Sequence, residues 1–387
     1  MNKVKCSATL AITTKAKKLR AGGKDVTNFA AGEPDFDTPD LIKQAAKQAI
    51  DSGFTKYTAS TGIPELKEAI SQKFKNDNSL NYEPGQIVVS CGAKHSIYNT
   101  LTVLVNKGDE VIIPSPHWVS YPEMVHLCQG SPRFIKTRSQ DGFKISPEEL
   151  KRNITSKTKL LILNSPSNPT GCLYSKNELE KIAEICVARK VFVLSDEIYE
   201  KITYDGLSCT SIASLGKDIN DFTVTVNGLS KSSSMTGWRI GYLGGPYDIV
   251  TAVTKLQDHS TSCPSSISQK AAVAALSAPG DVLEKMRAEF QKRRDCMSAG
   301  LDRIDKLGYF LPQGAFYMFC EISKTQLDSL TFADRLLEEA SVSVIPGVSF
   351  GRDDYVRMSF ATGIPEIEKG IRRIKDWITP LYASDHR

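Results

Sequence analysis

The chain has 387 residues, of which 41% are hydrophobic and 24% charged, and its formal net charge at pH 7 is +5. This composition excludes a disordered, collagenous or coiled-coil chain, and the length predicts two or three domains that can each bury a core. The positive surplus is spread thinly along the chain, without the dense basic run that is typical of nucleic-acid or membrane-surface binding. We therefore expect neither kind of partner.

The cysteines and histidines disfavour disulfide bonds and metal sites. The nine cysteines are an odd number with no Cys-x-x-Cys pair, which favours reduced thiols in a cytoplasmic protein. The five histidines show no i, i+4 pair, so we expect no metal ion. No apolar run approaches the roughly 20 residues that a helix needs to cross a bilayer. Residues 1–24 contain no acidic side chain, a pattern that transit peptides share.

The middle of the chain alternates short apolar runs with helix-length segments. Strands are expected at Gln86–Ser90, Glu110–Ile113, Lys159–Leu163, Val191–Leu194 and Phe222–Val226. Between two of them, Ser175–Arg189 carries apolar residues at three- and four-residue spacing, the period of an amphipathic helix. Continuous apolar strands that alternate with such helices predict an α/β fold, in which helices flank both faces of a mostly parallel sheet.

The pattern changes after about residue 280. A long charged helix is expected first, and shorter strands and helices follow: Val282–Lys306, Ala315–Ile322, Phe332–Ala340, Val342–Ile345, Tyr355–Phe360 and Pro365–Ile378. The first 45 or so residues lack the strand–helix alternation. We therefore predict a large domain over residues 46–280 and a small α+β domain that residues 1–45 and 281–387 form together.

Ligands of open α/β sheets bind beyond the carboxyl ends of the strands, so the residues that follow each strand are candidates for a site. After the first predicted strand, Gly92-Ala93-Lys94 opens a helix whose N-terminus can bind a phosphate. Most such turns merely connect two elements. After the second strand comes Trp118, which can equally be a core or lid residue.

The next three strands are followed by an amide, an acid with a phenol, and an amine with a guanidinium: Asn168, Asp196 with Tyr199, and Lys231 with Arg239. A carboxylate after a buried strand needs a cationic partner. One ligand type uses all of these groups, a phosphorylated and protonated aromatic aldehyde. A lysine forms a Schiff base with the aldehyde, an acid keeps the ring nitrogen protonated, an indole stacks on the ring, and an arginine with the helix end holds the phosphate.

At these residues the sequence resembles the fold-type-I pyridoxal 5′-phosphate (PLP) aminotransferases of class I, in particular the bacterial aspartate and aspartate/prephenate branch. The resemblance extends from about Ser7 to Ile378, and its most specific segment, Gly228–Gly241, fits the family's PLP-attachment motif. Asn164–Gly171 and Ser195–Tyr199 follow in the family's order and approximate spacing.

This resemblance implies PLP as the cofactor and assigns roles around its ring. Lys231 looks like the Schiff-base lysine and Asp196 like the partner of the pyridine nitrogen. Asn168 and Tyr199 would donate hydrogen bonds to the ring hydroxyl, and Trp118 would stack on the ring. Lys231, Asp196 and Tyr199 are thus the predicted catalytic residues.

The resemblance also assigns a phosphate site to Ala93, Lys94 and Arg239. Many relatives carry a serine three positions before the lysine, where this chain has Gly228. Either Ser230 compensates for the missing hydroxyl, or the phosphate is held with one donor fewer.

Three further residues have counterparts in the family. Arg357 matches the arginine that binds the substrate α-carboxylate, and Gly32 would offer a backbone N–H to the same group. Tyr57 resembles a tyrosine that reaches the phosphate across a subunit interface, which implies a C2 homodimer with shared sites. The basic segment from Ser7 to Arg20 resembles the mobile N-terminal segment of bacterial relatives, which argues against a transit peptide.

The implied function is ping-pong transfer of an amino group from aspartate, or a related L-amino acid, to 2-oxoglutarate. Some relatives bind the second carboxylate with an arginine in the region that reads Asp258–Thr261 here, where no arginine occurs. Lys94 is the alternative cation for that carboxylate, although it can equally be a solvated lysine. Trp118 and Asn168 are predicted to contact the substrate as well. Aromatic, kynurenine or prephenate transamination and a carbon–sulfur lyase remain alternatives, because fold does not fix the reaction.

Overall fold

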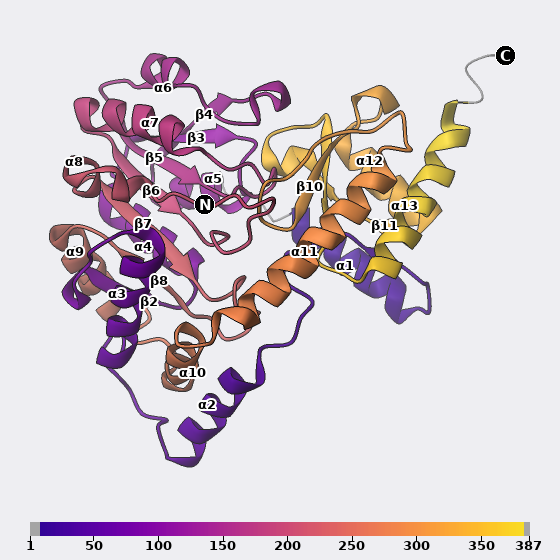
Figure 1. The fold of residues 1–387 in the computed structure, drawn as a ribbon. Coiled ribbons are helices and arrows are strands. Elements are labelled where there is room, and N and C mark those ends of the chain that lie inside the picture. Colours follow the sequence, from indigo (N-terminus) through magenta and orange to yellow (C-terminus); the bar gives the residue numbers. More distant parts are fainter. Residues whose placement is uncertain (1–7, 383–387) are drawn as a thin grey trace.

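The computed structural model describes residues 8–382, so Cys6 and Ser7 lie outside the described residues. A seven-stranded sheet forms the centre of the larger part of the molecule (Figure 1). In spatial order its strands are β2 (Ile87–Ser90), β8 (Gly241–Gly244), β7 (Thr223–Gly228), β6 (Phe192–Asp196), β5 (Thr158–Asn164), β3 (Glu110–Ser115) and β4 (Ser131–Lys136). Strand β8 runs antiparallel to both of its neighbours, and the other pairs are parallel. The predicted α/β fold with a mostly parallel sheet is confirmed.

Strand β5 shows why the sheet strands are continuously apolar. Leu160 and Ile162 pack into a core that includes α4 (Ala93–Leu104) and α9 (Tyr247–Asp258). Leu161 and Leu163 pack instead into the core with α7 (Lys176–Arg189) on the opposite face. Successive side chains of a strand point to opposite faces, so a sheet with helices on both faces buries the four consecutive residues Leu160–Leu163 of this central strand.

Further helices complete the larger part of the molecule. They are α2 (Asp40–Asp51), α3 (Pro64–Asn78), α5 (Ser120–Leu127), α6 (Pro147–Asn153), α8 (Lys217–Asn220) and α10 (Ser266–Leu276). Helix α10 contacts both α2 and α3, and α2 lies at the lower end of the ribbon in Figure 1. No helix in residues 8–382 is long and apolar enough to cross a membrane.

A smaller antiparallel sheet lies beside the large one, in the order β12 (Ile345–Pro346), β13 (Tyr355–Ser359), β10 (Tyr317–Glu321) and β9 (Gly308–Phe310). Three helices accompany it: α11 (Gly280–Leu301), α12 (Ser329–Ala340) and α13 (Ile364–Ile378). The N-terminal helix α1 (Ala8–Ala21) lies next to these elements in Figure 1, and β1 (Thr27–Asn28) pairs in parallel with β11 (Val342–Ser343).

Both chain ends therefore contribute to one core, in which Phe29 packs with residues of α12 and α13. The domain boundaries at residues 46 and 280 stay a prediction. Residue 46 lies inside α2, a helix that packs against α10, whereas α11 begins at Gly280.

The structure corrects two expected elements. The strand predicted over Val342–Ile345 is wrong as one element, because β11 pairs with β1 whereas β12 pairs with β13 in a different sheet. The helix predicted over Val282–Lys306 ends at Leu301, five residues early.

Two strands of the large sheet carry no clear sequence signal. Strand β4 lies at the edge of the sheet, and Ile135 is its one buried residue. Strand β8 begins and ends with glycine, and a Cβ atom on Gly241 would lie 2.1 Å from the backbone nitrogen of Ala93. Close backbone approach therefore requires glycine where a β-branched residue would have indicated a strand.

Candidate active site

The carboxyl ends of the sheet strands border a cavity of about 320 Å³. It is lined by Gly32, Ala93, Lys94, Ile97, Trp118, Val119, Tyr121, Asn164, Asn168, Asp196, Ile198, Tyr199, Ser230, Lys231, Thr236, Arg239, Tyr317 and Arg357. Every residue predicted to bind cofactor or substrate is in this lining except Tyr57. The small sheet supplies the last two side chains, so the cavity lies between the two sheets.

Lys231 follows β7 and presents its amine to the cavity. Its Nζ donates a hydrogen bond to the carbonyl oxygen of Gly32 at 2.6 Å. Burial is the main reason that the pKa of this amine is lowered to about 8; the charges of Glu33 and Asp196 raise it, and those of Arg357 and Arg239 add to the lowering. The amine can therefore lose its proton close to neutral pH, which an ordinary lysine cannot do.

Asp196 is the last residue of β6 and is 4% exposed. Its Oδ2 accepts a hydrogen bond from the Tyr121 hydroxyl at 2.6 Å, and its Oδ1 accepts one from the backbone N–H of Ile198 at 3.3 Å. Burial raises the pKa of this carboxyl to about 6, against the lowering effect of these two bonds and of the Lys231 charge. A buried acid of this kind is suited to pairing with a cationic group in the cavity.

Two asparagines and an arginine form a chain of contacts along the cavity wall. Asn164 donates from Nδ2 to the backbone carbonyl of Asp196 at 2.9 Å, and its Oδ1 accepts from the backbone N–H of Asn168 at 2.8 Å. Arg357 donates from Nη1 to Oδ1 of Asn168 at 3.0 Å. The amide oxygen of Asn168 is thus engaged, so its Nδ2 group is the part that can donate to a ligand.

Arg357 is 3% exposed and carries a buried N–H donor without a hydrogen-bond acceptor in residues 8–382. Its Nη2 donates to the carbonyl of Ala30 at 3.3 Å, and its guanidinium lies 4.2 Å from the ring centre of Tyr317. Within residues 8–382, its buried Nε has no hydrogen-bond partner. Because buried polar groups are nearly always paired, this orphan donor indicates a site for an anion such as a carboxylate.

Tyr199 and Tyr317 share a hydrogen bond of 2.9 Å between their hydroxyl groups. Tyr317 also donates to the carbonyl of Gly32 at 3.4 Å. Burial raises the pKa of Tyr199 well above its usual value, so its hydroxyl keeps its proton at neutral pH. Tyr317 therefore contacts Tyr199, the Gly32 carbonyl that also accepts the hydrogen bond of Lys231, and the guanidinium of Arg357.

Two cationic side chains, Lys94 and Arg239, lie at the start of α4. Ala93 is the first residue of this helix, and Arg239 donates from Nη1 to the carbonyl of Thr236 at 2.9 Å and from Nη2 to that of Cys91 at 3.3 Å. Lys94 Nζ lies 4.9 Å from the centre of the Trp118 ring, and burial, then the charge of Arg239, lowers the pKa of that lysine. Two cations and free helix N–H groups favour a dianionic phosphate.

The glycine that replaces the family serine lies in a tight place. A Cβ atom on Gly228 would lie 3.1 Å from the carbonyl oxygen of Ile240 and 3.1 Å from Cα of Gly241. A serine there would therefore need the adjoining strand β8 to shift slightly. Ser230 lines the cavity two residues later, which keeps it a candidate for the missing hydroxyl.

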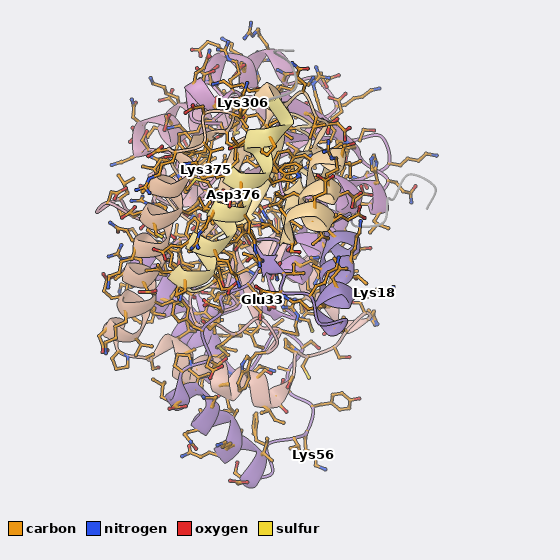
Figure 2. The ribbon with its side chains drawn as sticks, turned by 90° about the vertical axis from the view of Figure 1, so that its right-hand side faces the viewer. Lys18, Glu33, Lys56, Lys306, Lys375 and Asp376 are labelled. Carbon is orange, nitrogen blue, oxygen red and sulfur yellow. The ribbon has the colours of Figure 1, made fainter. Side chains whose placement is uncertain are left out.

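Tyr57 lies away from the cavity of its own chain. Its side chain is 93% exposed, on the segment between α2 and α3. Figure 2 shows the neighbouring Lys56 at the lower end of the molecule, well separated from Glu33, which follows the cavity residue Gly32. A role of Tyr57 at a site therefore requires a second chain.

Sequence reasoning missed four polar cavity residues: Tyr121, Asn164, Thr236 and Tyr317. Asn164 and Thr236 had a usable signal, because they lie in segments already singled out: Asn164 is the last residue of strand β5, and Thr236 lies between Lys231 and Arg239. The two tyrosines had none, since spacing alone does not say which face of a helix or strand borders the cavity.

Comparisons with known proteins identify the family. A family model described as aminotransferase class I and II matches residues 24–374. The chain is 50% identical to the aspartate aminotransferase of Geobacillus stearothermophilus, with 95% of each chain covered. It is 47% identical to a probable aspartate/prephenate aminotransferase of Rickettsia felis, over 97% of this chain and 94% of that one. The solved aspartate aminotransferase from Thermus thermophilus with maleate is 40% identical, at a TM-score of 0.93 over 97% of both chains. A chain matched over nearly its whole length, with this cavity, belongs to the class I and II aminotransferases.

Proposed function

We propose that this aminotransferase uses PLP to move the amino group of aspartate, or a related L-amino acid, to 2-oxoglutarate by a ping-pong mechanism. The observation that carries the proposal is one cavity that combines Lys231, whose pKa is lowered to about 8, the buried acid Asp196 and the buried, partly unpaired Arg357. The names of the relatives from Geobacillus and Rickettsia support aspartate as the donor.

The donor set of the cavity fits PLP. Its phosphate would lie at the N-terminus of α4 beside Arg239, and its ring nitrogen would face Asp196. Trp118 would cover one face of the ring, and the donors of Asn168 and Tyr199 would reach its hydroxyl. When bound, PLP supplies an aldehyde that reacts with amines and a protonated ring that withdraws electrons from the α-carbon.

The protein side chains bind the substrate and move its proton. Arg357 would hold the α-carboxylate through two parallel N–H donors, one of them the Nε that lacks a partner. Lys231 Nζ, neutral above its pKa of about 8, would take the α-proton as a general base. Asp196, ionised above about pH 6, would stabilise a positive charge on the ring nitrogen. Lys94 would bind the second carboxylate of aspartate.

Spectra of the half-reactions test the proposal. The purified protein should show a visible band of bound PLP that disappears on adding aspartate and returns with 2-oxoglutarate. Lys231→Ala should still bind PLP in equilibrium dialysis but show neither change. Wild-type rates in Lys231→Ala would refute the assignment. Release of pyruvate and ammonia from a sulfur amino acid, without any oxo acid, would favour the carbon–sulfur lyase instead.

The preferred donor is decided by the same assay with a panel of amino acids. Rate constants for aspartate, glutamate, tyrosine, phenylalanine and kynurenine separate an aspartate enzyme from an aromatic one. The Rickettsia relative, named for aspartate and prephenate, supports including prephenate as an acceptor.

The homodimer with shared sites belongs to the same proposal. The exposed Tyr57 supports it, since that side chain would reach the phosphate site of the partner subunit. Hybrid dimers of Lys231→Ala and Tyr57→Ala chains should recover activity, because one of their two sites keeps both residues. Hybrids as inactive as their parents would contradict shared sites. The eight cysteines among the described residues are all free, which supports a reducing compartment such as the cytoplasm.

A further inference from the structure

We propose that Tyr121 is a positioning residue that orients Asp196 and keeps it ionised for the ring nitrogen of PLP. The proposal rests on the function proposed above and deepens it, because it names the group that controls the acid. Tyr121 is the second residue of α5, and the chain reaches it from the end of β3.

The contact between the two side chains is short and buried. The Tyr121 hydroxyl donates to Oδ2 of Asp196 at 2.6 Å, and the two residues are 2% and 4% exposed. Among the residues that the structure describes, no other side chain donates to this carboxylate. Its other oxygen accepts a longer bond of 3.3 Å from the backbone N–H of Ile198. Tyr121 therefore determines which way the carboxylate faces.

The tyrosine ring is itself held in place. It packs in the core between α4 and the sheet, and it meets the Trp118 ring edge to face, with 5.2 Å between the ring centres. The backbone N–H of Tyr121 also donates to the carbonyl of Trp118 at 3.2 Å. One short segment thus positions both the indole predicted to cover the ring and the phenol that holds the acid.

The electrostatics give this hydrogen bond its effect. The titratable groups that face Asp196 are Tyr121, Tyr199 and Lys231. Burial raises the pKa of Asp196, the Tyr121 bond is the largest opposing contribution, and the charge of Lys231 adds to it. Burial and the nearby carboxylate raise the pKa of Tyr121 itself well above its usual value, so it stays a donor. Without the hydroxyl, Asp196 would take up a proton at higher pH and lose the charge that a protonated ring nitrogen needs.

The test compares Tyr121→Phe with Tyr82→Phe. The first removes the hydroxyl and keeps the packed ring. The second is a matched control, because Tyr82 is also 2% exposed and its hydroxyl shares a 3.2 Å hydrogen bond with Thr225, outside the cavity. The dissociation constant of the cofactor-free protein is measured for PLP and for an analogue with C–H in place of the ring nitrogen. Thermal midpoints check that both variants fold.

We expect PLP to bind about tenfold more weakly to Tyr121→Phe at pH 7, a loss of about 1.4 kcal/mol, because the hydroxyl no longer stabilises the ionised carboxylate. The loss should shrink toward pH 9, where the variant's Asp196 is ionised as well. Binding of the analogue should not change, nor should either ligand's affinity for Tyr82→Phe. In an Asp196→Asn background, Tyr121→Phe should have no further effect on PLP binding.

Equal losses for PLP and the analogue would overturn the proposal, because Tyr121 would then act through packing. Unchanged PLP binding in Tyr121→Phe would overturn it as well. Failure of the wild-type protein to bind PLP at all would instead refute the proposed function, so the two failures are distinguishable.

Discussion

Glu197 offers a test of how burial controls ionisation next to the site. It follows Asp196 in the chain but points away from the cavity and is 1% exposed. Its Oε1 accepts from the hydroxyls of Ser195 at 2.8 Å and Ser211 at 2.6 Å, and its Oε2 accepts from Nδ2 of Asn78 at 3.1 Å. Burial, followed by the charge of Glu200, raises its pKa from 4.5 to about 7.

The perturbation is Glu197→Gln, which keeps the size and removes the titration. Between pH 4.5 and about 7 the folded wild-type chain keeps a proton on Glu197 that the unfolded chain has lost. Its free energy of unfolding therefore falls as pH rises through this window, by about 3 kcal/mol from this group. Glutamine does not titrate, so between pH 4.5 and about 7 the free energy of unfolding of Glu197→Gln should rise by about 3 kcal/mol relative to that of the wild type.

The assay is urea unfolding of both proteins at pH 5, 6, 7 and 8, at one protein concentration. Glu178→Gln is the matched control, since hydrogen bonds from Lys144 and Ser175 outweigh burial and lower the pKa of Glu178. With that control the difference from wild type should stay nearly constant from pH 5 to pH 8, because a carboxyl with a lowered pKa changes stability only below about pH 4.5. Parallel pH profiles for Glu197→Gln and wild type would refute the reasoning.

Three further predictions concern the cavity. Lys94→Ala should raise KM for aspartate and 2-oxoglutarate much more than for an aromatic amino acid, and equal losses in steady-state assays would remove Lys94 from specificity. Arg357→Lys should raise KM for every amino donor about 100-fold, because a lysine cannot form the two parallel hydrogen bonds of the guanidinium, which contribute about 1.5–3 kcal/mol each. A change below threefold in the half-reaction would contradict the carboxylate-binding role inferred from the unpaired Nε of Arg357. Gly241→Ala should lower the thermal midpoint and weaken PLP binding together, since its Cβ would lie 2.1 Å from the backbone nitrogen of Ala93 at the start of α4; an unchanged midpoint would contradict this close packing.

The site residues that follow the predicted parallel strands could be found from the sequence alone, because the carboxyl ends of parallel strands meet along one edge of the sheet. Asn168, Asp196 and Lys231 each follow a strand that was recognisable by its apolar run, and all three line the cavity. Tyr121 and Tyr317 could not be found in the same way. Each lies inside an element, and its direction depends on how that element packs against the rest of the molecule.

The antiparallel strand β8 escaped prediction for a related reason. Its glycines are needed for contact with the start of α4, and such residues weaken the apolar pattern that reveals a strand. The split between β11 and β12 likewise depends on pairing partners that are distant in the chain, with Thr27 for one and Arg357 for the other.

The pairing of β1 with β11 also has a consequence for biosynthesis. Val342 leaves the ribosome 315 residues after its partner Thr27 (342 minus 27), which takes roughly 15–60 s at common elongation rates. Throughout that interval Phe29, fully buried in the finished protein, has no completed core to enter. The segment around Phe29 is thus synthesised long before it can reach its final place, and any chain that stops before α12 and α13 leaves a large aromatic side chain exposed to aggregation or to chaperones.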